Sequence, residues 1–103
     1  MKPSLTKSLI GFETECIIIN ESGIPSPGAD SIIKQADPTH VSFLKKECSQ
    51  EMIEVISLPF LRVSESLGHL LDQLEYTVGL AATENSLLLP LFSKLSSSVA
   101  ATR

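Results

Sequence analysis

The sequence lacks the features that mark membrane and nucleic-acid-binding proteins. Its longest apolar run is the six residues from Leu87 to Phe92, whereas a membrane-spanning helix needs about 20. The N-terminus has no hydrophobic core of the kind found in secretory signals. Basic residues number 8 against 12 acidic ones, the net charge is −4, and the only basic doublet is Lys45-Lys46. We therefore expect a soluble, cytoplasmic protein that binds neither membranes nor nucleic acid.

Cysteine is scarce, and the two that occur form no recognised pattern. Cys16 and Cys48 stand 32 residues apart, with no CxxC pair and no histidine at ligand spacing. They are expected to be free thiols on buried strands. The P-loop and the GxGxxG loop are also missing. His40 and His69 have no cysteine or serine partner at a recognised spacing, so we assign them no function.

Length and composition bound the size of the fold. A chain of 103 residues that is 43% hydrophobic can form one domain with a single modest core. That hydrophobic fraction excludes general disorder. The polar or small residues at 1–7 and 96–103 are predicted to be loose.

The pattern of apolar residues predicts an α+β domain. Apolar runs at 8–19, 52–58 and 87–92 read as strands of a small, mainly antiparallel sheet. This sheet is expected to pack against one long helix over residues 64–85, with Ser64 as its N-cap. The helix carries an apolar stripe that we expect to face the core, formed by Val63, Leu67, Leu70, Leu71, Leu74, Val78, Ala81 and Ala82.

Two further segments are less sharply defined. A short helix is predicted over residues 31–36, capped by Asp30 and stopped by Asp37-Pro38. Residues 41–48 fit a helix and an extended chain equally well.

Two glutamates interrupt the first predicted strand. Alternate side chains of a strand share a face, so Glu13 and Glu15 point the same way, roughly 7 Å apart. Two neighbouring carboxylates repel each other and resist burial. A divalent metal, basic side chains or plain solvent could each offset their charge.

A second acidic block leads into the next strand. Glu54 interrupts the apolar run, and Glu47 lies seven residues earlier, which on an unbroken strand would face the opposite way. Both reach one site only if a turn or bulge intervenes, and we place it at Ser49-Gln50. The alternative is that Glu47 and Glu51 are simply exposed at the entrance of the strand.

Together these blocks resemble the N-terminal part of the glutamate–cysteine ligase family, in particular its bacterial carboxylate–amine ligase branch. That family opens with a G-x-E-x-E strand followed by apolar residues, a turn and a glycine. A second block has a Glu, a Gln three residues later and a Glu seven residues later, and a long amphipathic helix follows. The likeness spans most of residues 8 to 92, and its matching positions are Gly11, Glu13, Glu15, Ile17 to Ile19, Asn20, Gly23, Glu47, Gln50, Glu54, Ser57 and the helix from Leu67 to Ala82.

The resemblance implies a glutamine-synthetase-like site in which sheet carboxylates hold Mg²⁺ beneath ATP. A glutamate γ-carboxylate would be phosphorylated, and the amine of cysteine or another small molecule would displace the phosphate, as in glutathione biosynthesis. It also implies that Gln50 orients a ligand, and that the metal ligands are Glu13, Glu15, Glu47 and Glu54.

The chain also departs from the family pattern. The family has Gly-Thr-His-Pro after its long helix, where this chain reads Leu88-Leu89-Pro90-Leu91. Family members are several times longer, and Arg62 and Arg103 are the only arginines available to clamp phosphates and a substrate carboxylate. We therefore expect the N-terminal fragment of a larger ligase domain, inactive unless another segment, a second chain or a homo-oligomer completes the site. The alternative is a non-catalytic or regulatory interaction module that keeps the fold.

Overall fold

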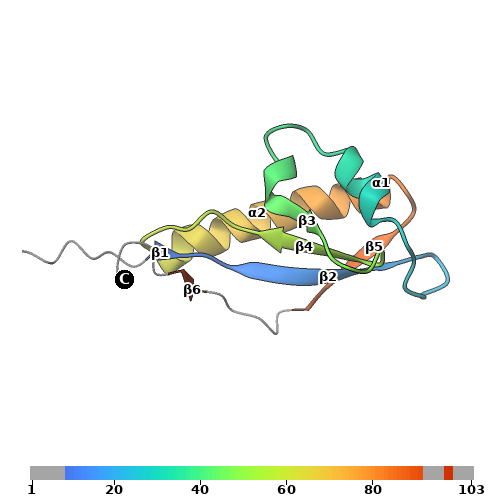
Figure 1. Ribbon diagram of the computed structural model, residues 1–103, viewed down its shortest axis with the longest axis horizontal. Helices are drawn as coiled ribbons and strands as arrows, with labels where there is room; N and C mark the ends of the chain where they lie inside the picture. The colour runs from blue at the N-terminus through green and yellow to red at the C-terminus, as the bar shows by residue number, and fades with distance from the viewer. Residues whose placement is uncertain (1–8, 92–96, 99–103) are drawn as a thin grey trace, which may run out of the picture.

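The computed structural model describes residues 9–91 and 97–98 as an α+β fold (Figure 1). The predicted loose ends, 1–7 and 96–103, lie outside these residues except for the short strand at 97–98. In chain order the elements are β1 (Leu9–Ile10), β2 (Glu13–Ile19), α1 (Ala29–Lys34), η2 (Val41–Phe43), β3 (Leu44–Lys46), β4 (Met52–Ile56), α2 (Val63–Ala82), β5 (Leu87–Leu91) and β6 (Ser97–Ser98).

A four-stranded antiparallel sheet forms the centre of the molecule, with strand order β3-β4-β2-β5. The three predicted strands are therefore confirmed, and β3 adds an edge strand from the segment whose structure the sequence left open. The predicted strand at 8–19 is broken at Gly11-Phe12. Phe12 bonds there through its backbone to Ser57, while β1 pairs with β6.

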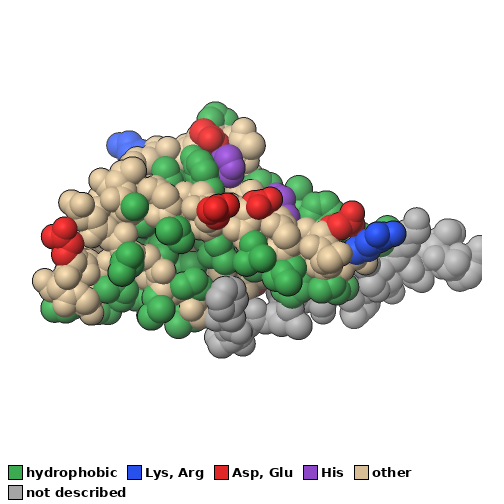
Figure 2. Space-filling view, turned by 180° about the vertical axis from the view of Figure 1, so that it is seen from behind, with side chains coloured by type: hydrophobic (Ala, Val, Ile, Leu, Met, Phe, Trp, Pro, Cys, Tyr) green, Lys and Arg blue, Asp and Glu red, His purple; other side chains and the backbone are tan. Residues whose placement is uncertain are grey.

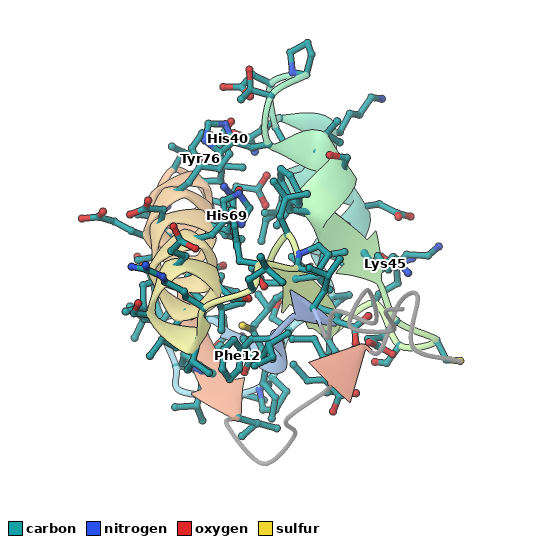
Figure 3. All side chains as sticks on the ribbon, turned by 90° about the vertical axis from the view of Figure 1, so that its left-hand side faces the viewer. Phe12, His40, Lys45, His69 and Tyr76 are labelled. Carbon is teal, nitrogen blue, oxygen red and sulfur yellow. The ribbon has the colours of Figure 1, made fainter. Side chains whose placement is uncertain are left out.

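The two faces of the sheet differ because side chains alternate along each strand. On β2, Thr14, Cys16 and Ile18 are buried, whereas Glu13, Glu15 and the other intervening residues are only half-buried. Helices α1 and α2 cover the buried face, as the end-on view in Figure 3 shows. We call this the covered face and the opposite one the open face. The core on the covered face comprises Cys16, Ile18, Ala29, Ile32, Leu44, Ile53, Val55, Leu70, Leu74, Ala81 and Leu88.

Helix α2 is where it was predicted, but about half of its predicted core stripe faces outward. Exposed fractions are 50% for Val63, 40% for Leu67, 51% for Leu71 and 42% for Val78. Figure 2 shows hydrophobic side chains gathered on this side of the molecule. The expectation that the whole stripe is core is therefore wrong.

Ser66 and Thr77 take buried positions of the helix because their hydroxyl groups find hydrogen-bond partners there. The Ser66 hydroxyl lies 2.8 Å from the Ser57 hydroxyl and donates to the Leu58 carbonyl. The Thr77 hydroxyl donates to the carbonyl of Gln73 one turn earlier. Hydropathy alone cannot anticipate this, since it treats every serine and threonine as a surface residue.

Neither predicted side-chain cap forms. Helix α2 begins after Arg62, two residues earlier than a Ser64 cap would place it. Helix α1 begins after Gly28, so Asp30 lies inside its first turn. The carbonyl of Gln50 accepts the N–H groups of Gly28 and Ala29 and so takes the place of a capping side chain. At the other end of α2, Asn85 adopts a left-handed conformation with φ of 58°, a common way to end a helix.

The cysteines are free, and one of them is not where it was expected. Cys16 is buried on β2 as predicted, and burial raises the pKa of its thiol to about 12. Cys48 is exposed in the turn after β3, so its predicted place on a buried strand is wrong. No helix within residues 9–91 has both the length and the apolar character needed to cross a bilayer.

Candidate metal centre

The open face brings together glutamates from strands that are distant in sequence. Strand β2 pairs with β4 so that Glu15 lies directly opposite Glu54. On the other side of β4, Lys45 of β3 lies opposite Glu54. Like charges directly opposite each other destabilise a sheet, so the Glu15–Glu54 pair is an unfavourable choice for stability alone.

Glu47 reaches the same face through the turn that joins β3 to β4. Ser49 organises this turn, since its carbonyl accepts the Met52 N–H and its hydroxyl accepts the Glu51 N–H. Glu47 lies two residues after Lys45 and therefore continues the same face of the hairpin. The turn lies where the sequence placed it. Because it interrupts the alternation of side chains, Glu47 and Glu54 can lie on the same face although they are seven residues apart.

Three of the glutamates form a compact group of oxygen ligands. One carboxylate oxygen each from Glu15, Glu47 and Glu54 lie within 4.8 Å of one another, and all three side chains are half-buried. Two oxygens bound to one Mg²⁺ at about 2.1 Å can be at most about 4.2 Å apart, and two bound to Ca²⁺ about 5 Å. The spacing already suits a Ca²⁺-sized ion, and small side-chain rotations bring it to that of Mg²⁺.

The neighbouring carboxyl groups change the titration of Glu54. Its pKa is raised to about 7, first by a hydrogen bond with the Glu13 carboxyl group, then by burial and by the negative charges of Glu13 and Glu47. Lys45 acts in the opposite direction. Without a cation, the Glu54 carboxyl group therefore stays protonated close to neutral pH, and it donates a hydrogen bond to the Glu13 carboxylate.

Glu13 completes the set of four predicted metal ligands, although it is not one of the three converging residues. It lies opposite Ile56 on β4, diagonally across from Glu54, and the two carboxyl groups are hydrogen-bonded. All four glutamates thus lie on or beside the open face. The sequence predicted a shared face for Glu13 and Glu15, and it made a common site for Glu47 and Glu54 conditional on the turn. Their role as metal ligands stays a prediction.

Gln50 is used elsewhere. Its side-chain amide donates to the Asp30 carboxylate at 2.9 Å, and its carbonyl oxygen accepts the Asp30 N–H at 3.3 Å. These bonds fasten the β3–β4 turn to α1. The ligand-orienting role suggested by the resemblance stays a prediction.

A hollow of about 240 Å³ adjoins the glutamates. Among the described residues, its charged lining consists of Glu13, Glu54 and Lys45. The bend before β2, the last residue of β4 and the segment after β4 complete the wall with Gly11, Phe12, Ile56, Ser57 and Pro59. Lys45 was noted in the sequence only as part of a basic doublet. Its two-residue spacing from Glu47 was the available signal that it shares the face of the glutamates.

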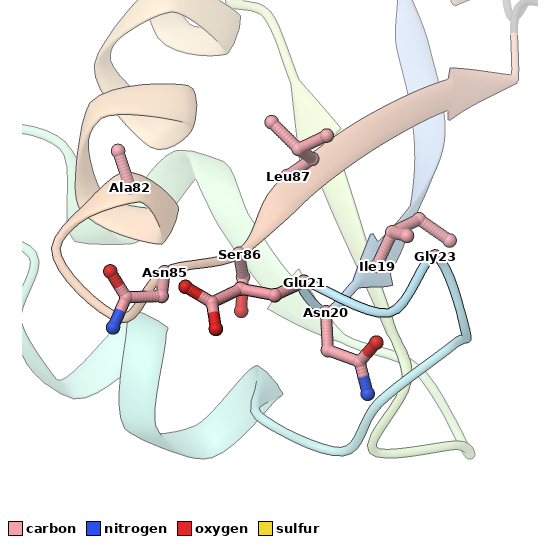
Figure 4. A pocket seen from close by; sticks show the side chains of 8 residues that line it. All are labelled: Ile19, Asn20, Glu21, Gly23, Ala82, Asn85, Ser86 and Leu87. Carbon is pink, nitrogen blue, oxygen red and sulfur yellow. The ribbon is translucent and has the colours of Figure 1, made fainter.

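A larger hollow of about 510 Å³ lies at the other end of β2 (Figure 4). It is lined by Ile19, Asn20, Glu21, Gly23, Ala82, Asn85, Ser86 and Leu87. Ile19 is six residues from Glu13, or about 20 Å along a strand. Glu21 is the one ionisable residue among the described residues that line it, so it offers less chemistry than the smaller hollow despite its volume.

A layer of rings that includes His40, His69 and Tyr76 lies beside α2 (Figure 3). His40 stacks on Tyr76 with ring centroids 3.7 Å apart, and its Nδ1 lies 2.7 Å from the Asp37 carboxylate, which lowers the pKa of Asp37. His69 Nδ1 accepts the Leu58 N–H at 3.1 Å. These contacts tie loops to the helix, and we assign the layer a structural role.

The comparisons with known proteins gave no significant match, neither to a family model, nor to a curated protein, nor to a solved structure. The chemistry of the site is therefore argued from its own residues. A cluster that offers only carboxylate oxygens fits a hard divalent cation such as Mg²⁺ or Ca²⁺ better than the softer metals that prefer nitrogen and sulfur ligands.

Proposed function

We propose that the open face binds a divalent cation, and that the chain forms the metal-binding portion of an ATP-dependent carboxylate–amine ligase of glutamate–cysteine ligase type. The observation that carries the cation site is the convergence of Glu15, Glu47 and Glu54 within 4.8 Å. The ligase type rests on the order and spacing of the two acidic blocks and the long helix in the sequence.

The residues fit the ion that such a ligase needs. Mg²⁺ is usually held by one or two protein carboxylates together with water and phosphate oxygens, and it would neutralise charge on a transferred phosphoryl group. The chain's own contribution is to hold carboxylates at a fixed separation on a rigid sheet. Glu54 would give up its proton when the ion binds, because the cation favours the ionised carboxylate.

One observation favours a second candidate, the non-catalytic interaction module. The outward face of α2 exposes Leu67, Leu71 and Val78, an apolar strip that a partner could cover. This module would need neither a cation nor the four glutamates as a group.

A thermal denaturation series with Mg²⁺ distinguishes the two candidates. Ligand at tenfold its dissociation constant stabilises the native state by about 1.4 kcal/mol, which for a chain of this size raises the melting temperature by about 5–10 °C. We expect this rise with millimolar Mg²⁺ above pH 7, where Glu54 is ionised. Glu15→Gln and Glu54→Gln should each remove it.

Glu75→Gln is the matched control, because Glu75 is an exposed glutamate of α2. It should leave the effect of Mg²⁺ unchanged. Absence of a shift with Mg²⁺, Mn²⁺ and Ca²⁺ in the wild-type chain would exclude the cation site and favour the interaction module. A shift that survives in both Glu15→Gln and Glu54→Gln would show that the ion binds elsewhere. A further rise when ATP accompanies Mg²⁺ is expected of a ligase and not of a simple cation site.

A further inference from the structure

Lys45 lies beside the candidate metal centre and belongs to the wall of the smaller hollow. It is placed opposite Glu54 across the β3–β4 pair, on the edge strand of the sheet. Figure 3 shows its side chain on the side of the molecule away from α2. The next residue, Lys46, behaves differently although it has the same side chain. It forms an ion pair with Asp30 on α1, with 3.5 Å between the ammonium nitrogen and the carboxylate oxygen.

Among the residues that the structure describes, the ammonium group of Lys45 has no such ion-pair partner. The ion pairs found within residues 9–91 are those of Lys46 with Asp30 and of His40 with Asp37. Lys45 is exposed, and it acts on Glu54 through its charge. It is therefore available to a ligand that enters the hollow.

The charges of the hollow suggest the kind of ligand. Glu13, Glu54 and Lys45 are its ionisable lining residues. Once a cation is held by the glutamates, their charge is largely satisfied, and Lys45 remains as a hydrogen-bond donor with a positive charge facing the same space. An anionic oxygen group placed there meets two positive partners, the ion and the ammonium group, and both contacts are charge-assisted.

We propose that Lys45 is an anion-recognition residue, and that the hollow takes a carboxylate or phosphate group held between the bound cation and Lys45. This rests on the proposed cation site and adds to it the residue that selects an anionic ligand. The simpler alternative is that Lys45 serves only as a counter-ion for Glu54.

The test separates the lysine from the cation by removing the carboxylate charges. In the variant Glu13→Gln/Glu54→Gln, Lys45 is the only charged residue left among the described residues that line the hollow, while Glu15 and Glu47 of the adjoining cluster keep their charge. Inorganic phosphate or acetate should then bind without any metal, and the site can be followed through amide and Lys side-chain shifts in ¹⁵N nuclear magnetic resonance spectra. Adding Lys45→Gln should weaken binding about tenfold, as expected for the loss of one charged hydrogen bond. Comparing phosphate with acetate shows which anion the hollow prefers.

Lys46→Gln in the same background is the matched control and should leave the anion affinity unchanged. Equal anion affinity with and without Lys45 would overturn the proposal, as would shifts confined to Lys46 or to the hollow lined by Ile19 and Leu87. If unfolding affects the double variant, the wild-type chain with Mg²⁺ serves instead. There Lys45→Gln should abolish the tightening of Mg²⁺ binding by phosphate. If Lys45 were only a counter-ion, Lys45→Gln would tighten Mg²⁺ binding and leave the effect of phosphate on that binding unchanged. This result would also contradict the proposal.

The two proposals can fail separately. If Mg²⁺ does not bind the wild-type chain but phosphate binds the double variant through Lys45, the cation site is wrong, and the recognition of the anion by Lys45 stands without the cation. If Mg²⁺ binds and the affinity for phosphate and for acetate does not depend on Lys45, the cation site stands and the anion site is wrong.

Discussion

The two faces of the sheet use the same strands for different purposes. On the covered face, Cys16, Ile18 and Ile53 are fully buried, and the buried hydroxyl of Thr14 donates to the Leu91 carbonyl. On the open face, the residues between them include Glu13, Glu15 and Glu54, all half-buried. One face therefore removes apolar surface from water, while the other gathers like charges at a cost in stability. Because the two sets of side chains alternate, substitutions can change one face and spare the other.

The largest expected effect compares neighbouring isoleucines on the two faces of β2. Ile18→Ala removes a side chain that is 1% exposed and should lower the free energy of unfolding by about 2–5 kcal/mol. Ile17→Ala, on the open face between Met52 and Leu89, should cost only about 1 kcal/mol, since its side chain is only partly removed from water. Urea denaturation measures both. Equal losses would mean that something covers the open face as tightly as the helices cover the other.

This alternation is also the part of the fold that the sequence predicts best. The period of two along β2 is strict, so a shift of one residue would bury every glutamate, and only one register suits both faces. The same logic placed Glu13 and Glu15 together. It could not place Glu47, whose side depends on the number of residues in the turn, until the turn was assigned to Ser49-Gln50.

The buried face of helix α2 is harder to predict than that of a strand. Side chains spread around the axis of a helix, whereas along a strand they alternate between two faces. Neighbouring Leu70 and Leu71 are equally apolar, yet they are 2% and 51% exposed. The choice between them depends on Ser66 and Thr77, whose hydroxyls find partners in the interior. Lys45 was missed for a related reason, because its importance comes from its cross-strand neighbour Glu54 and not from adjacent residues.

An intermediate effect is expected from the titration of Glu54, which belongs to the open face alone. Its pKa rises from 4.5 to about 7 on folding, so the native state holds this proton more tightly than the unfolded chain does. The resulting stabilisation is fully present below the unfolded value and is lost as the pH rises through about 7. In a chelating buffer, the melting temperature of the wild-type chain should therefore fall from about pH 5 to about pH 8.

Glu54→Gln should flatten this fall, because the amide keeps a hydrogen-bond donor for Glu13 at every pH. Millimolar Mg²⁺ should flatten it in the wild-type chain, because the cation stabilises the ionised form. Thermal denaturation at several pH values measures both, with Glu75→Gln as the control that retains the wild-type slope. A slope in Glu54→Gln equal to that of the wild-type chain would assign the pH dependence to other groups.

The smallest effect concerns the uncovered side of α2, where two glycines interrupt the helix. A Cβ atom added at Gly79 meets no atom within 4 Å, and the same is true of Gly68. Alanine loses less conformational freedom than glycine when it enters a helix, so Gly79→Ala should stabilise the chain by about 0.5–1 kcal/mol. Gly23→Ala is the control of opposite sign, because Gly23 has a φ of 80°, which strains any other residue. Urea denaturation at two protein concentrations measures both variants. If Gly79→Ala instead lowers the free energy of unfolding, and the size of this loss changes with protein concentration, the outward face of α2 packs against another molecule. In that case both faces of α2 would be covered, whereas the sheet keeps one open face.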